Sequence, residues 1–175
     1  HSSLEDDTLL PLLDAALAAG TRVLVVCNTV GRANALLRAV ESRPASQYLF
    51  RVAGVACPHH GRFARADRDA MDAAVSQCLG KGLIGTQTLE HSLDIDADWL
   101  ITDPGPMDVM LQRIGRLHRH VRSFRPKGYE RPRVLLRCPP GGDLAGYLRP
   151  DSTLRGPAGL GIVYQDGCIL QRTLD

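Results

Sequence analysis

The chain has 175 residues, of which 44% are hydrophobic and 23% are charged, and its formal net charge at pH 7 is +2. This composition is typical of a globular protein, and the length suits one domain of ~100–200 residues. No apolar run approaches the ~20 residues of a membrane-spanning helix, which excludes a membrane-embedded class. No charged-then-apolar leader opens the chain, so we expect no secretory signal and no membrane partner.

The cysteines are dispersed, odd in number and free of any C-x-x-C pair: Cys27, Cys57, Cys78, Cys138 and Cys168. We therefore expect reduced thiols and a cytoplasmic location. The six histidines show no metal-ligand spacing, because His118-x-His120 has no nearby carboxylate or Cys at a familiar ligand distance. The sequence predicts no metal site.

Strand and helix patterns alternate along the chain. An amphipathic helix is predicted from Leu4 to Ala19, and Asn28-Thr29 can cap a second helix from Val30 to Val40. A third helix is predicted from Ala64 to Leu79, with Gly80 as its stop. The predicted strands are Arg22–Cys27, Phe50–Cys57, the stretch around Ile84, Trp99–Thr102 and Val134–Leu136. This alternation predicts an α/β fold with a mostly parallel central sheet flanked by helices.

Polar residues follow several of the predicted strands. They are Asn28-Thr29, His59-His60, Gly85-Thr86 and Asp103. Ligands of parallel α/β sheets gather at the carboxyl ends of the strands, so these residues are candidates for a binding site.

Met107 to His120 is predicted to form one helix with two different faces. Its apolar positions recur at helical spacing: Met107, Met110, Leu111, Ile114 and Leu117. This stripe is expected to anchor the helix in a core. Gln112, Arg116 and Arg119 fall on the opposite side, where two guanidinium groups can bind phosphate oxygens. An ordinary solvated face explains the same pattern equally well.

Basic residues are concentrated after this point. Between positions 113 and 133 stand Arg113, Arg116, Arg119, Arg122, Arg125, Lys127, Arg131 and Arg133, against the single acid Glu130. Such an excess attracts polyanions such as nucleic acid or nucleotide phosphate. The alternative is a solvated basic loop.

A second stretch favours phosphate binding over an ordinary solvated basic face. An apolar strand at Leu83-Ile84 runs into Gly85-Thr86-Gln87-Thr88, followed by the acidic Leu93-Asp94-Ile95-Asp96. With Gln112-Arg113-Ile114-Gly115-Arg116-Leu117-His118-Arg119, it resembles the second RecA-like lobe of superfamily 2 helicases. Among these it is most similar to the CRISPR-associated helicase–nuclease of type I systems.

The resemblance implies a three-layer RecA-like domain. We expect residues 1–19 to form an N-terminal helix or interlobe linker and residues 20–139 to form the lobe. Residues 140–175 would be a linker and a segment leading to a C-terminal domain absent from this chain.

The resemblance also implies roles at a nucleotide site. Gln112 would sense the γ-phosphate of ATP, Arg116 and Arg119 would be arginine fingers, and Asp94 would meet the ribose or couple the site to the DNA groove. Arg113 follows Gln112 and therefore lies about 100° round the helix from it, so we expect a structural or interlobe role for Arg113.

Contacts with a single-stranded DNA backbone are the other implied role. The residues concerned are Asn28, Thr29, Arg62, Gly85, Thr86 and Gln87. Asn28 and Thr29 also suit a plain helix N-cap, and the two roles can coexist. Gly85 permits a close approach of the chain, and Thr86 offers a hydroxyl and an amide. Such contacts hold sugar and phosphate without reading bases.

Two motifs of ATP hydrolysis are absent from the sequence. There is no G-x-x-x-x-G-K-[ST] loop, because Gly80-Lys81-Gly82 has the wrong spacing, and no Asp-Glu-x-His or Asp-Glu-x-Asp magnesium motif. We therefore expect ATP to be shared with another lobe that holds Mg²⁺, and this fragment alone to be inactive. The implied partners are single-stranded DNA, the rest of the helicase–nuclease chain and a CRISPR RNA-guided surveillance complex in the cytoplasm of a prokaryote.

Three other functions remain open. One is the lobe of another superfamily 2 RNA or DNA helicase, although Ser92 to Asp96 and Leu117 to His120 argue against it. Another is a non-enzymatic module that binds nucleic acid or a protein partner. A small-molecule α/β enzyme is the third, but no nucleophile–base motif is present.

Overall fold

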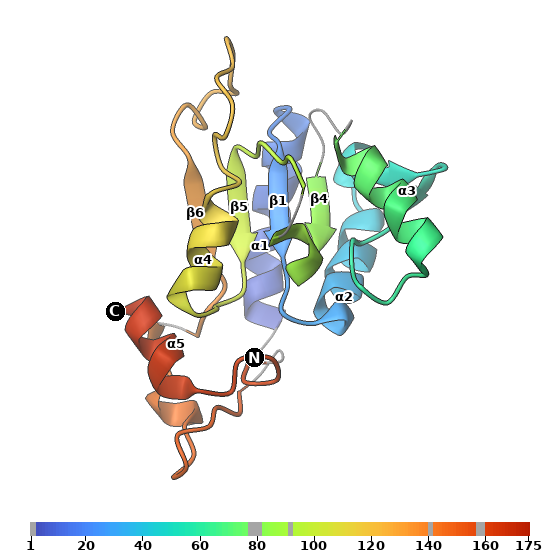
Figure 1. The fold of residues 1–175 in the computed structure, drawn as a ribbon. Helices are drawn as coiled ribbons and strands as arrows, with labels where there is room; N and C mark the ends of the chain where they lie inside the picture. The colour runs from blue at the N-terminus through green and yellow to red at the C-terminus, as the bar shows by residue number, and fades with distance from the viewer. Residues whose placement is uncertain (1–2, 77–81, 91–92, 140–141, 157–159) are drawn as a thin grey trace.

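A four-stranded parallel sheet in the order β4-β1-β5-β6 forms the centre of the molecule (Figure 1). Its strands are β1 (Val23–Val26), β4 (Gly82–Gly85), β5 (Trp99–Thr102) and β6 (Arg133–Leu136). The computed structural model describes residues 3–76, 82–90, 93–139, 142–156 and 160–175. Val26 lies beside both Gly85 and Thr102, so the carboxyl ends of β4, β1 and β5 are level.

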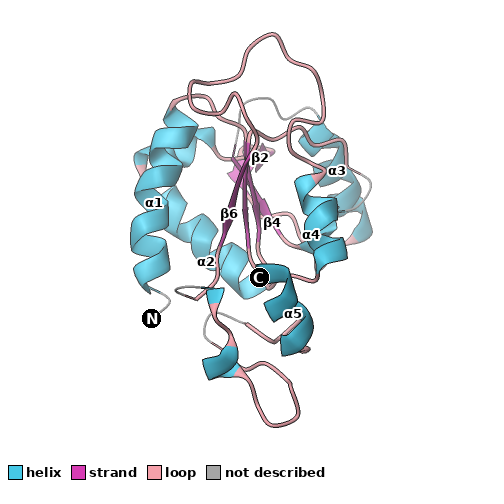
Figure 2. Ribbon diagram, turned by 90° about the vertical axis from the view of Figure 1, so that its left-hand side faces the viewer, coloured by secondary structure: helices cyan, strands magenta, loops and turns pink. Residues whose placement is uncertain are grey.

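Helices cover both faces of this sheet, as Figure 2 shows edge-on. Helices α1 (Ser3–Ala18) and α2 (Val30–Glu41) lie on one side, and α3 (Arg65–Ser76) and α4 (Met107–Ile114) lie on the other. The predicted three-layer α/β architecture is confirmed. In the described part of the chain, no helix is both long and apolar enough to cross a membrane.

The alternation of side chains along β1 explains why both faces are covered. Val23 and Val25 belong to the hydrophobic cluster shared with α1 and α2, whereas Leu24 and Val26 belong to the cluster on the α3 and α4 side. All four side chains are buried. A strand that is apolar on both faces needs two covering layers, because each exposed apolar face would cost free energy.

The predicted strand Phe50–Cys57 is wrong. This stretch folds back on itself as the short hairpin β2 (Arg51–Val52) and β3 (Val55–Ala56). The turn between the strands places Ala53 at φ 49° and Gly54 at φ 82°, the left-handed geometry that tight hairpins favour. The chain runs beside β4 on both sides of this hairpin, where Phe50 N donates to Gly82 O (2.9 Å) and His59 N donates to Ile84 O (2.9 Å).

The remaining elements are short. The 3₁₀ helices are η1 (Pro44–Tyr48), η2 (Gln87–Glu90) and η4 (Ala145–Tyr147). Helix α5 (Gly167–Leu174) closes the chain and packs Leu170 against Leu144 and Leu154 in a separate small core. The C-terminal limit predicted for the third helix, Leu79 and Gly80, lies outside the described residues.

The predicted division at residues 19/20 and 139/140 stays a prediction. Leu13 and Leu17 of α1 belong to the same hydrophobic cluster as Val23 of β1, so this helix packs as part of the core.

Candidate functional site

Helix α4 is shorter than predicted. It ends at Ile114, with Gly115 as its C-cap, and does not continue to His120. After a tight turn the chain pairs with Ala97, whose N–H donates to Arg116 O (2.9 Å) and whose carbonyl accepts from His118 N (3.0 Å). His118 takes a φ of 46°, which no helix interior allows. Pairing with Ala97 therefore ends the helix, against the periodicity of the sequence.

The buried face of α4 also differs from the expectation. Met110 and Leu117 are buried, but Met107, Leu111 and Ile114 are exposed, so the predicted apolar anchor is mostly wrong. The side chain that points fully into the protein is Arg113, which is 0% exposed. Its hydrogen-bonding partners compensate the cost of burying a charge.

Arg113 joins three segments of the chain. Its Nε donates to Glu90 Oε1 (2.8 Å), and Nη2 pairs with the same oxygen (2.7 Å). Nη1 donates to Thr102 Oγ1 (2.6 Å) and to Asp103 O (2.7 Å), while Nη2 reaches Asn28 Oδ1 (3.2 Å). Arg113 therefore holds β5, the end of β1 and η2 together, in agreement with a structural role.

The structure brings the predicted polar residues together at the carboxyl edge of the sheet, but commits several side chains to internal bonds. Asn28 Nδ2 donates to Pro104 O (2.7 Å), and its Oδ1 accepts from Arg113. Gln87 Nε2 donates to Asn28 O (3.0 Å). A Cβ on Gly85 would lie 2.5 Å from His59 O, so this glycine is required for packing inside the protein.

Thr29 and Thr86 differ in their accessibility. Thr29 is partly buried and caps α2, because its hydroxyl accepts from Arg32 N (3.3 Å). Thr86 is buried, and its N–H donates to His59 O (2.9 Å). Within the described ranges no hydrogen bond of the Thr86 hydroxyl is found.

Arg62 lies at the surface beside this edge. It follows His60, whose ring stacks on Phe63 at 4.4 Å between centroids. The side chain of Arg62 is exposed. It is free to meet an anion from solvent.

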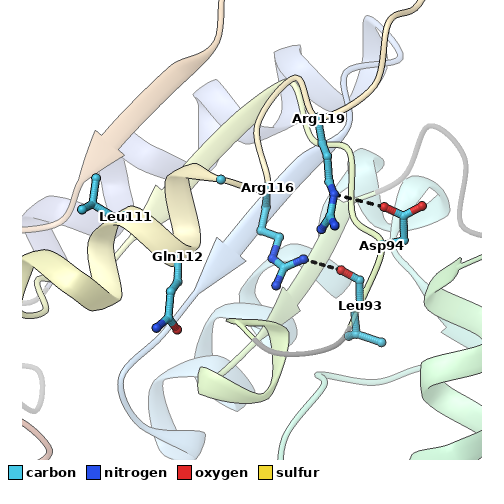
Figure 3. Close-up of a pocket in the computed structure, with 7 residues that line it drawn as sticks. Leu93, Asp94, Leu111, Gln112, Arg116 and Arg119 are labelled. Carbon is cyan, nitrogen blue, oxygen red and sulfur yellow. Dashed lines mark hydrogen bonds and ion pairs between the residues drawn. The ribbon is translucent and has the colours of Figure 1, made fainter.

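Gln112, Arg116 and Arg119 line one pocket of about 580 Å³ together with Leu93 and Asp94 (Figure 3). Arg116 reaches across it, with Nη1 donating to Leu93 O (2.5 Å) and Nη2 donating to Glu90 O (2.5 Å). Arg119 Nε pairs with Asp94 Oδ1 at 3.3 Å, and His120 Nε2 lies 2.8 Å from the same oxygen. The predicted nucleotide-site residues therefore converge although the helix that was expected to align them stops early.

The electrostatics of this pocket favour an anion. Burial, and then the charge of Arg119, lower the pKa of Arg116, while Asp94 raises it. The Nε of Arg116 is buried and has no hydrogen-bond partner in the described part of the chain. Two guanidinium groups that line the same pocket can bind phosphate oxygens.

Two arginines of the basic stretch after α4, Arg122 and Arg125, are neutralised by buried aspartates. Arg125 bridges Asp98 (2.6 Å) and Asp96 (3.1 Å), and Arg122 pairs with Asp98 at 2.9 Å. Arg133 lies over the ring of Tyr129, 5.1 Å from its centroid. The expectation that the whole stretch attracts polyanions is wrong for Arg122 and Arg125, because Asp96 and Asp98, just before β5, bind their guanidinium groups inside the protein.

Tyr164 is a site residue that the sequence did not reveal. It comes from the C-terminal segment, and its hydroxyl lies close to the side chains of Gln87 and Arg113, both of which act to lower its pKa. Burial, followed by the charge of Glu90, raises the pKa of Tyr164. The only signal in the sequence was an aromatic residue after Gly-x-Gly, which carries no information about its partner.

The chain is similar to known proteins in both sequence and fold. Residues 19–122 match the family described as CRISPR-associated nuclease/helicase Cas3, C-terminal. The CRISPR-associated endonuclease/helicase Cas3 of Escherichia coli K12 is 37% identical over 157 residues, which are 83% of this chain and 16% of that protein. The chain therefore spans about a sixth of the length of this relative.

Solved structures agree on the fold. The T. fusca Cas3-ADP crystal structure has a TM-score of 0.70 at 23% identity, covering 91% of this chain and 18% of that one. A chain of a CRISPR RNA-guided surveillance complex, pre-nicking, has a TM-score of 0.63 at 24% identity and covers 98% of this chain and 20% of that one. With a RecA-like sheet, converging arginines and a family match over more than half its length, the chain belongs to the Cas3 C-terminal helicase family.

Proposed function

We propose that this chain is the second RecA-like lobe of an ATP-dependent helicase–nuclease that moves along single-stranded DNA and degrades invading DNA in CRISPR interference. The observation that carries the proposal is the convergence of Gln112, Arg116 and Arg119 in one pocket of a chain of this family. The lobe would lend charge to a nucleotide seated mainly on another lobe, which would also hold Mg²⁺.

The pocket residues fit that role chemically. Two Nη atoms of Arg116 are held by backbone carbonyls, which fixes the guanidinium plane, while its Nε N–H remains unused. When bound, ATP supplies a γ-phosphoryl group whose oxygens carry the developing negative charge. Arg116 and Arg119 stabilise that charge, and Gln112 lies beside them to sense the terminal phosphate.

The strand would lie at the neighbouring carboxyl edge of the sheet. Arg62 is exposed there, and Thr29 and Thr86 stand at the ends of β1 and β4. Contacts of this type hold the sugar–phosphate backbone and are indifferent to base sequence, as movement along DNA requires.

Glu90 supports coupling between the two sites. Its carboxylate binds Arg113, which touches Asn28 on the strand side, and its carbonyl binds Arg116 in the nucleotide pocket. A shift of Arg116 upon hydrolysis would therefore reach the strand edge through η2.

The test replaces Arg116 or Arg119 by Ala in the complete helicase–nuclease. We expect ATP turnover to fall by about 10³-fold or more, the effect of losing an arginine finger, with single-stranded DNA affinity largely retained. Arg38→Ala, which changes an exposed arginine on the far side of the sheet, is the matched control and should leave both quantities unchanged.

Normal hydrolysis by both variants would overturn the finger assignment. DNA binding by the complete protein without any ATP turnover would instead favour a non-enzymatic binding module. Recruitment by an RNA-guided surveillance complex belongs to the same proposal, and pull-down with that complex tests it.

A further inference from the structure

His59 lies where the two segments proposed to hold the strand meet. Its N–H donates to Ile84 O (2.9 Å), and its carbonyl accepts from Thr86 N (2.9 Å). One of these segments, His60 to Arg62, follows it directly, and the other, Thr86 to Thr88, is hydrogen-bonded to it. The close approach of Gly85 to His59 O leaves no room for a side chain between them.

The buried ring of His59 extends this junction to helix α3. The ring is 1% exposed, and its Nδ1 lies 2.7 Å from Thr88 Oγ1 while its Nε2 lies 2.6 Å from Asp72 Oδ1. Thr88 Oγ1 also donates to His59 O at 3.1 Å. The ring therefore fills the space between α3 and η2 with a hydrogen bond at each end.

The acceptor at one end determines how the ring is oriented. A carboxylate can only accept, so His59 Nε2 carries a proton and donates to Asp72. Nδ1 is left for Thr88, whose single hydroxyl proton can be directed either to Nδ1 or to His59 O. In both arrangements the Asp72 carboxylate fixes the ring plane, and the ring plane fixes the Thr88 hydroxyl.

Asp72 itself is not part of the core. Its side chain is 41% exposed on α3, whereas the imidazole that it binds is almost inaccessible. Its replacement by Ala removes no apolar side chain from the core, but it takes away the carboxylate that holds the buried ring of His59.

We propose that His59, held by Asp72, is a positioning residue that sets the Thr86–Thr88 loop relative to Arg62, so that both contact the same phosphodiester backbone of a single strand. The inference rests on the proposed function of this edge. It assigns a role to three residues, His59, Asp72 and Thr88, that make no contact with the nucleotide pocket.

The experiment measures binding of a fluorescent oligodeoxythymidine to the complete helicase–nuclease by anisotropy. Asp72→Ala and Thr88→Val should each raise the Kd about three- to tenfold, as expected for the loss of one hydrogen bond in a network. Asp72→Asn keeps an oxygen that can accept from Nε2 and should bind nearly as the unmodified protein. Asp69→Ala, an exposed aspartate on the same helix, is the matched control.

The double variant Asp72→Ala/Thr88→Val tests whether the two residues act together through His59 or affect DNA binding independently. If both act through His59, its Kd should not exceed that of the weaker-binding single variant, because coupled residues are not additive. A multiplied effect, an unchanged Kd in Asp72→Ala, or equal loss in Asp72→Asn would overturn the proposal. Failure of the unmodified protein to bind the oligonucleotide would overturn the proposed strand site itself.

Discussion

Arg113 and Glu90 form an ion pair that is buried on both sides, with Nη2 and Nε of Arg113 at 2.7 and 2.8 Å from the same carboxylate oxygen. The pair lies between the strand edge and the nucleotide pocket. Glu90 also binds Arg116 through its carbonyl. One buried contact therefore sets the position of η2 against α4, and with it the relative position of the two proposed sites.

Replacement of Arg113 by Met should destabilise the protein by about 3–5 kcal/mol, because it leaves the Glu90 carboxylate buried without its cation. Arg113→Lys should also destabilise it, since an ammonium group cannot reach Glu90, Thr102 and Asn28 together. Urea unfolding measures both variants. Arg119→Ala serves as the control, because its ion pair with Asp94 is solvent-exposed.

The sheet could be predicted from sequence because its information is local. Val23 to Val26 is a continuous β-branched and apolar run, and a run of this kind needs cover on both faces. The hairpin at residues 51–56 was not predicted, although Ala53-Gly54 marks a turn between Arg51-Val52 and Val55-Ala56. A longer strand and a hairpin share the same composition, and only pairing with β4 decides between them.

The site was less accessible to prediction because its partners are distant in the chain. Arg113 binds acceptors 11, 23 and 85 residues away. Periodicity within one helix carries no information about partners so distant in the chain. The pattern therefore placed Leu111 in the core, where the structure has Arg113. Tyr164 reaches Gln87 from the far end of the sequence, and no spacing rule predicts such a contact.

Tyr164→Phe should loosen the C-terminal segment while keeping its ring in place. The variant loses the hydroxyl that contacts Gln87 and Arg113, which should cost about 0.5–1.5 kcal/mol of stability. Limited proteolysis should cleave the C-terminal segment faster. Tyr147→Phe is the matched control, since Tyr147 packs in the small C-terminal core. Identical proteolysis of both variants would show that the hydroxyl does not hold the segment.

Asp96 should make the stability of the lobe dependent on acid pH. Burial acts to raise its pKa, but hydrogen bonds from Arg125 and His120 N and the charges of Arg125 and Arg122 outweigh it, so the pKa is lowered. A carboxyl group whose folded pKa is lowered stabilises the native state above its ordinary pKa of about 4, and this contribution is lost as the pH falls through the folded pKa.

Asp96→Asn should accordingly be less stable than the unmodified protein at pH 7, and the difference should shrink as the pH is lowered below about 4. Thermal unfolding across this range measures it. Asp69→Asn changes an exposed aspartate and should show no such difference at either pH. A constant difference between the Asp96 variant and the unmodified protein at all pH values would mean that Asp96 is not held ionised by its arginines.

Arg62 and Thr86 should affect strand binding in different ways, because one is charged and exposed and the other is neutral and buried. Each phosphate that a protein neutralises on a single strand contributes about 0.7 to the slope of log Kd against log salt concentration. Arg62→Ala should therefore weaken binding and reduce that slope by about 0.7. Thr86→Val should weaken binding without altering the slope, because a neutral hydroxyl group neutralises no phosphate and therefore releases no counterion. Anisotropy titrations at four salt concentrations distinguish the two, and equal slopes for Arg62→Ala and the unmodified protein would remove Arg62 from the strand site.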